Sequence, residues 1–237
     1  MTETLTNKPR VTVHVVADQS AGSRADEGFV RVRRLVLQNE YADGTRSRDY
    51  RYDCAERDAM DAVGIVLYHQ PPDEPGTVLV CLRSAIRPPL ALRPGYSLPI
   101  DGENGDPTMF EIPAGLVETD EKGEAGLRAC SARETMEEVG IDVLADHFGR
   151  LGPAACLSPG LMGEKIHFFC AEVDPATAIA PGEDGSPVEE RAVVEWVPID
   201  EAIAACADGR IADLKTEVAL FRLREWLRSA EEMRTRP

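Results

Sequence analysis

The chain has 237 residues, and its shares of 43% hydrophobic and 29% charged residues are typical of a folded globular protein rather than a disordered one. Its 42 acidic and 26 basic residues leave a formal net charge of −16, which disfavours binding to nucleic acids or to anionic membranes. An anionic substrate would therefore require an added cation, and a divalent metal ion is the usual one.

The first 57 residues predict an antiparallel β-meander. Strand patterns occur at residues 11–16 (VTVHVV), 28–37 (GFVRVRRLVL) and 49–54, with a turn signal around Asp43 before the last of them. A ribbon of two or three strands is barely stable alone. We therefore expect this arm to pack on, or exchange with, a second protomer, so that the protein is a homodimer.

Residues 58–237 predict a second unit that mixes strands with a few helices, which favours an α/β sandwich over a doubly wound sheet. Apolar patterns predict strands at 62–68, 77–82, 150–157, 166–173 and 192–198. Helical patterns occur at 123–139, 199–207 and 213–232. Gly140 stands where a C-terminal cap would end the first of these helices. Five prolines in 84–109 predict a long surface loop.

The termini and the cysteines indicate a cytoplasmic protein. Residues 1–10 are polar, without the apolar region of a secretory signal, and no run approaches the ~20 apolar residues of a membrane helix. The six cysteines are scattered and form no Cys-x-x-Cys pair. This favours reduced, mostly buried thiols over a disulfide framework or a zinc site.

The segment 133–141 (RETMEEVGI) places three carboxylates on one helix face. Glu134, Glu137 and Glu138 stand at positions i, i+3 and i+4, so they are neighbours on the helix surface. Arg133 can pair with Glu137, but one arginine cannot neutralise three acids. The face is therefore either solvated or binds a divalent cation through hard oxygen ligands.

This helix, together with the strand end and glycine turn before it, resembles the Nudix box. The matching residues are Gly115, Glu121, Arg133, Glu134, Glu137, Glu138, Gly140 and Ile141. The resemblance implies a Nudix-type α/β/α sandwich and an enzyme that hydrolyses pyrophosphate bonds.

Two positions depart from the pattern of that family. Eleven residues separate Glu121 from Arg133 where the family has seven, so four residues are inserted. Four residues are roughly one helical turn, so either the helix begins a turn earlier or the loop before it bulges. This leaves open whether Glu121 or Glu124 fills the first acidic position. Thr135 also replaces an apolar residue.

The resemblance further implies which groups bind the metal ion. Mg²⁺, with Mn²⁺ as a substitute, is expected on Glu134, Glu137 and Glu138, with the carbonyl oxygen of Ala114 as a further ligand. Arg133 is expected to orient these carboxylates rather than to touch the substrate.

Flanking segments resemble the branch of the family that cleaves ADP-ribose and other nucleoside diphosphate sugars. The substrate phosphates are expected at Arg83 or Arg87 and at the turn of Gly115. Arg87 alternatively reads as a solvated loop arginine. The general base is expected at Glu189 or Glu190, in a loop that alternatively reads as merely solvated. Glu189 is preferred.

A different function class remains open. A Nudix-fold module could bind a nucleotide sugar, or regulate in response to it, without turnover. Such a module would be expected to lose carboxylates of the box, and this chain keeps all three on the helix. The sequence therefore favours the enzyme.

Overall fold

The computed structural model of the chain describes residues 28–100, 105–182 and 186–235, so the predicted strand at 11–16 lies outside the described residues. The strands are β1 (Arg31–Leu37), β2 (Tyr50–Glu56), β3 (Ala62–His69), β4 (Leu79–Ile86), β5 (Thr108–Glu111), β6 (Ala114–Leu116), β7 (Gly149–Arg150), β8 (Ala155–Cys156), β9 (Lys165–Glu172) and β10 (Val194–Pro198). The α-helices are α1 (Pro88–Leu92), α2 (Gly123–Val139), α3 (Ile199–Ala207) and α4 (Leu214–Thr235).

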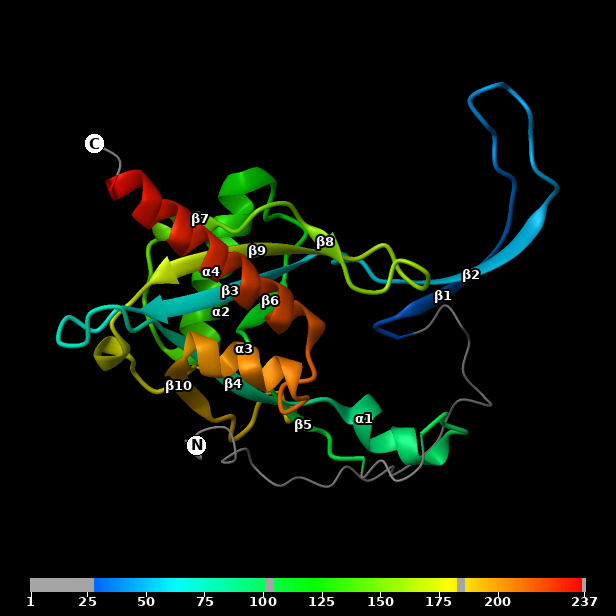
Figure 1. Cartoon of the computed structure of the whole chain (residues 1–237). Helices are drawn as coiled ribbons and strands as arrows, with labels where there is room; N and C mark the ends of the chain where they lie inside the picture. The colour runs from blue at the N-terminus through cyan, green and yellow to red at the C-terminus, as the bar shows by residue number, and fades with distance from the viewer. Residues whose placement is uncertain (1–27, 101–104, 183–185, 236–237) are drawn as a thin grey trace.

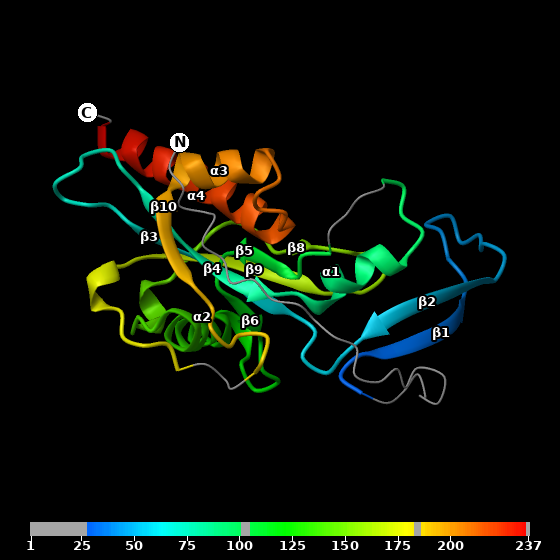
Figure 2. The same cartoon turned by 90° about the horizontal axis from the view of Figure 1, so that it is seen from below.

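A mixed sheet forms the centre of the molecule. Its strands follow the order β10-β4-β3-β9-β7, with β5 paired to β4, β6 to β3 and β8 to β9. The pairing of β3 with β9 is parallel, whereas its pairings with β4 and β6 are antiparallel. Helix α2 covers one face of the sheet, and α3 and α4 cover the other (Figures 1 and 2). The predicted α/β/α sandwich is confirmed.

Strand β3 explains why the sheet can carry helices on both faces. Successive side chains of a strand point to opposite faces. Val66 and Tyr68 pack in the cluster that includes α3 and α4, and Ile65 and Leu67 pack in the cluster that includes α2. The strand is apolar at nearly every position because neither face meets water, as in other sheets covered on both sides.

The N-terminal ribbon is a separate two-stranded antiparallel sheet, β1 with β2, that projects from the sandwich (Figures 1 and 2). Near its base the amide of Ala55 donates to the carbonyl of Leu161 at 2.8 Å, and the hydroxyl of Tyr52 donates to the carbonyl of Gly160 at 2.7 Å. The ribbon is therefore tied to the loop that follows β8.

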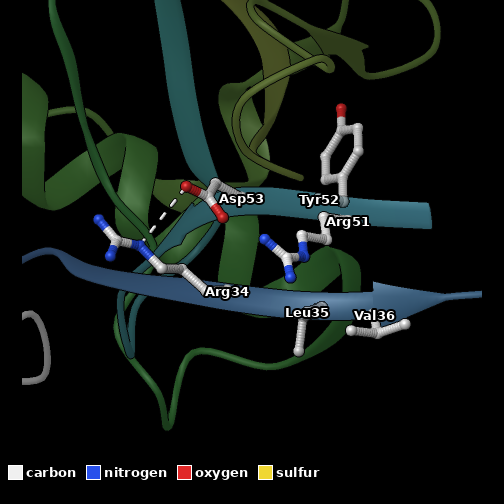
Figure 3. A pocket seen from close by; sticks show the side chains of 6 residues that line it. All are labelled: Arg34, Leu35, Val36, Arg51, Tyr52 and Asp53. Carbon is white, nitrogen blue, oxygen red and sulfur yellow. Dashed lines mark ion pairs between the residues drawn. The ribbon is translucent and has the colours of Figure 1, made fainter.

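A hollow of about 580 Å³ lies on the ribbon itself. Its lining comes entirely from β1 and β2 and includes an ion pair between Arg34 and Asp53, with N–O distance 3.5 Å (Figure 3). It shares no residue with the carboxylate helix, so we do not assign catalysis to it.

Two sequence predictions need correction. The segment 84–109 is not a continuous loop, because β4 extends to Ile86, α1 follows at once, and β5 begins at Thr108. Pro88 and Pro89, two of the five prolines that indicated a loop, occupy the first positions of α1, where a missing amide hydrogen costs no helical hydrogen bond. The predicted strand at 150–157 is instead two short strands, β7 and β8, and each pairs with β9.

The remaining sequence predictions on the helices and thiols hold. Helix α2 spans the predicted residues and ends at Gly140, whose φ of 74° is the left-handed conformation of a glycine cap. All six cysteines are free, and four of them are buried. Within the described residues, no helix has both the length and the apolar character that crossing a membrane requires.

Candidate active site

The carboxylate helix lies against β6 because a glycine permits it. A Cβ atom on Gly115 would lie 1.8 Å from the carboxyl carbon of Glu134, far inside van der Waals contact. Gly115 pairs with Val63 of the central strand, so β6 is fixed on the sheet. The absence of a side chain at this position lets the Glu134 carboxylate approach the backbone of β6.

Glu138 is the most deeply buried acid of the box. One of its oxygens accepts a hydrogen bond from Nη1 of Arg83 at 3.0 Å, and the other accepts one from the amide of Ala114 at 2.9 Å. Burial raises the pKa of Glu138 to about 8, against the opposing effect of Arg83, and the charges of Glu134 and Glu189 raise it further. A second cation near this carboxylate would favour its ionised form.

Glu134 is likewise partly buried and lies near other carboxylates of the site. Burial raises its pKa to about 6, opposed by Arg133, and the charges of Glu137 and Glu189 add to the increase. Nη1 of Arg133 donates to Glu134 at 2.7 Å and to Glu137 at 3.2 Å. The predicted pair of Arg133 with Glu137 is thus present, and Arg133 contacts Glu134 as well.

The inserted turn leaves Glu121, rather than Glu124, beside the box. Arg133 contacts the Glu121 carboxylate at 3.3 Å, whereas Glu124 pairs with Arg128 and Arg150. A Cβ atom on Gly126 would lie 2.3 Å from the backbone carbon of Glu121. The chain before α2 therefore packs directly on the first turns of the helix, which brings Glu121 within reach of Arg133.

The two candidate bases occupy different environments. Glu189 is half-buried, and its Oε2 lies 3.4 Å from Nη2 of Arg83. Its charge acts on both Glu134 and Glu138, so it belongs to the same cluster. Glu190 is exposed. The structure thus brings Glu189, of the two, to the carboxylate helix.

A cavity of about 580 Å³ adjoins the box. Ala114 and Gly115 line it, so it begins where the carboxylate helix meets β6. Other lining residues come from the ribbon base, α1, β5, the loop after β8 and the start of α4: Phe29, Arg57, Pro89, Leu90, Met109, Glu111, Leu157, Glu164, Asp213 and Lys215.

Three cations line this cavity, each paired with an acid. Arg87 and the buried Lys215 both contact Glu111, the latter at 2.8 Å, and Arg57 pairs with Glu164. Burial of the Arg87 guanidinium lowers its pKa, but the charge of Glu111 and the hydrogen bond to it outweigh that effect and leave the pKa raised. Of the two predicted phosphate-binding arginines, Arg87 lines the cavity.

Sequence reasoning did not select Glu111, Lys215 or Arg57 as site residues. Glu111 and Lys215 lie 104 positions apart, and their contact depends on how α4 meets β5. A lysine in an amphipathic helix ordinarily reads as surface charge. The available signal was the segment Asp213–Thr216, which is one of the flanking segments that resemble the nucleotide-sugar branch.

The donor set fits a hard divalent cation in its chemistry. Carboxylate oxygens crowd together at the box, as such ions prefer. In the described part of the chain, however, no group of three His, Cys, Asp or Glu side chains is arranged so that it could hold a metal ion. The box acids instead pair with Arg83 and Arg133. A bound ion would therefore draw carboxylates away from these guanidinium groups.

The fold and the acidic helix beside β6 define a Nudix-type α/β/α hydrolase. The family model described as NUDIX domain matches residues 60–217. A GDP-mannose pyrophosphatase of Yersinia enterocolitica is 36% identical over 164 residues, which are 69% of this chain and 73% of that relative. The chain belongs to the Nudix family, and the sequence-based prediction of a Nudix hydrolase is confirmed.

Two further comparisons agree with this assignment. A GDP-mannose pyrophosphatase of Klebsiella pneumoniae is 33% identical over 122 residues, which are 49% of this chain and 54% of that relative. The crystal structure of an ADP compounds hydrolase has a TM-score of 0.54 at 17% identity, covering 94% of this chain and 95% of that one. At this identity the structural likeness concerns the fold alone.

We predict that Gly115→Ala displaces the Glu134 carboxylate, because the new methyl group would occupy its place. A misplacement of about 1 Å can cost roughly 100-fold in rate, so we expect a loss of that order together with weaker Mn²⁺ binding. Steady-state kinetics and Mn²⁺ titration test this. Gly95→Ala is the control, because no atom lies within 4 Å of its added Cβ. Equal effects of the two changes would contradict the role of Gly115.

Proposed function

We propose that the protein hydrolyses the pyrophosphate bond of a nucleoside diphosphate sugar with a divalent metal ion, giving a nucleoside monophosphate and a sugar phosphate. One observation carries the proposal. The charges of Glu134, Glu138 and Glu189 act on one another, and the Glu134 carboxylate lies against Gly115, which also lines the cavity with paired cations. This arrangement supports catalysis on an anionic substrate at a metal site.

Glu134, Glu137 and Glu138 would hold Mg²⁺, or Mn²⁺ in its place, and the carbonyl oxygen of Ala114 is a further proposed ligand. The bound ion supplies charge neutralisation of the phosphates and a water of lowered pKa. Arg133 keeps two of these carboxylates in place through its contacts to Glu134 and Glu137. It is proposed to orient ligands rather than to bind substrate.

The cavity supports a diphosphate linked to a sugar. Arg87 can exchange Glu111 for a phosphate oxygen, since it is the more exposed partner of that pair, with 46% of its side chain accessible against 5% for Glu111. Arg57 and Lys215 offer further donors along the same wall. Because the relatives are named for GDP-mannose, we propose GDP-mannose ahead of ADP-ribose.

We propose Glu189 as the general base. It lies at the box, is half-buried and comes from a turn outside the carboxylate helix, so it can act on water without leaving the metal short of a ligand. Glu190 is the less favoured candidate because its side chain is exposed. Glu137 and Glu164 follow as alternatives.

A substrate panel tests the proposal directly. With Mg²⁺ present, we expect kcat/KM for GDP-mannose or ADP-ribose to exceed that for 8-oxo-dGTP by at least roughly 100-fold, because the cavity must be filled beyond the diphosphate. UDP-glucose and NADH complete the panel. A preference for the triphosphate would refute the substrate class. Calorimetric binding of a nucleotide sugar without turnover would favour the alternative, a nucleotide-sugar binding module.

We expect Glu138→Gln to lower turnover by roughly 1000-fold or more, because the neutral amide cannot replace a carboxylate ligand of the metal. Circular dichroism should show the wild-type fold, since Gln retains the size and the acceptor for Ala114. EDTA should abolish activity in the same way. The matched control is Glu225→Gln, an exposed acid on α4 that pairs with Arg228. Retention of more than about a tenth of the activity by Glu138→Gln would place the metal elsewhere.

We also propose that the protein is a homodimer formed through its ribbon. Phe29, Val30, Val32 and Val36 are all more than 40% exposed in the single chain. Apolar side chains gathered on one projecting ribbon indicate a surface that another chain covers. The proposal gives the ribbon a function that packing within one protomer does not supply.

Light scattering should therefore report about twice the chain mass of 25.9 kDa at micromolar concentration. Changing Val32 and Val36 together to Asp should shift the mass to that of the monomer, because burying two carboxylates at an interface is costly. A wild-type monomer would contradict the proposal.

A further inference from the structure

Arg83 connects two carboxylates that come from different parts of the chain. It lies on β4 and is only 3% exposed. Its Nη1 donates to Glu138 on the box helix at 3.0 Å, and its Nη2 lies 3.4 Å from Glu189. Arginine suits this position because its rigid fork can serve two acceptors at once, whereas a lysine ammonium acts as a point charge.

The third nitrogen of the same guanidinium shows how strongly the two contacts determine its placement. In the part of the chain that the structure describes, Nε of Arg83 is the buried side-chain polar atom that lacks a hydrogen-bond partner. A buried donor without a partner costs about 1–3 kcal/mol. The guanidinium is therefore oriented so that Nη1 and Nη2 contact Glu138 and Glu189, although this leaves Nε without a hydrogen-bond acceptor.

The backbone around Glu189 is fastened to the same strand. The carbonyl of Val193 accepts from the amide of Ser84, and the amide of Ile86 donates to Val188 at 3.3 Å. Between these anchors the chain turns, with Arg191 at a φ of 62°, an uncommon value for a residue with a side chain. The backbone thus brings Glu189 near β4, where its carboxylate contacts the buried guanidinium of Arg83.

A direct role of Arg83 on the substrate does not fit its place. Arg83 does not line the cavity beside Gly115, whereas Arg87, four residues further on, does. Its two outer nitrogens are already engaged by Glu138 and Glu189. A substrate phosphate would have to displace one of these carboxylates from a buried arginine, which is costly.

We propose that Arg83 is a positioning residue for Glu189. Its guanidinium holds the Glu189 carboxylate beside Glu138, and it acts on the reaction through that carboxylate rather than on the substrate. The inference rests on the proposed function, in which Glu189 is the general base.

A double-mutant cycle tests this proposal, with Arg83→Met, Glu189→Gln and the two combined. We expect Arg83→Met to lower kcat by about 100-fold, because the base loses its position, and to change KM by less than about twofold. In the Glu189→Gln background the same change should have almost no further effect, since residues that act as one unit are not additive. If the fold-losses in kcat of the two single variants multiply in the double variant, the proposal is overturned. A rise in KM with unchanged kcat in Arg83→Met would overturn it as well.

The same cycle separates Glu189 from Glu138 as the residue through which Arg83 acts. If Arg83 acts through Glu138, the loss on Arg83→Met persists in the Glu189→Gln background and Mn²⁺ affinity changes with it. Arg150→Met is the control for loss of an arginine, because Arg150 pairs with Glu124 away from the box.

Amide hydrogen exchange gives a measure that needs no substrate. We expect the segment 186–193 to exchange at least about tenfold faster in Arg83→Met than in wild type, because the contact of Glu189 to this buried cation is lost. Unchanged exchange contradicts the proposal. If the wild-type protein hydrolyses no nucleotide sugar, the proposed function fails, but this measurement still decides whether Arg83 holds the segment. Should Arg83→Met not fold, Arg83→Lys, which keeps the charge without the fork, takes its place in both experiments.

Discussion

Repulsion between carboxylates is the constraint on which this structure depends. Glu134, Glu138 and Glu189 raise the energy of one another's charged forms in a space shielded from water. Two like charges 4 Å apart repel by roughly 4 kcal/mol at an effective dielectric constant of 20, which is a large part of a domain's total stability of about 5–15 kcal/mol. The ion pairs of Arg83 with Glu138 and of Arg133 with Glu134 offset part of this repulsion and leave negative charge that a cation would neutralise.

Close backbone approach is the second condition, and it depends on two glycines. At Gly115 the Glu134 carboxylate takes the space of a side chain, and at Gly126 the backbone of Glu121 does so. The contact between Gly126 and the backbone of Glu121 accommodates the four-residue insertion. The longer α2 begins beside Glu121, and the missing Cβ of Gly126 lets the preceding chain fold back on the helix. The inserted turn therefore keeps the contact between Glu121 and Arg133.

The predictable part of this protein is what local sequence determines. The spacing of the carboxylates predicted helix α2, and the glycine after Val139 predicted where it ends. Both signals are local, because a cap and a helical face depend on neighbouring residues alone. The burial of Arg83 depends on which face of the sheet its side chain points to. Cys81, two residues earlier and therefore on the same face of β4, packs in the cluster that includes α2. The contact of Lys215 with Glu111 depends on pairing between distant segments. Proline content misled at 84–109, because prolines that open a helix resemble those of a loop.

The acids of the box and the wall of the cavity come from different layers of the fold. The acids of the box lie on α2 and are fixed by the central sheet, so their geometry varies little with the periphery. The cavity wall is instead assembled from peripheral pieces, including Phe29 and Arg57 at the ribbon base. The guanidinium of Arg57 lies over the ring of Phe29 and pairs with Glu164, which joins the ribbon to the loop after β8. Any change in how the ribbon is held therefore reaches the cavity wall before it reaches the acids of the box, so under the proposed function substrate preference can vary while the geometry of those acids stays the same.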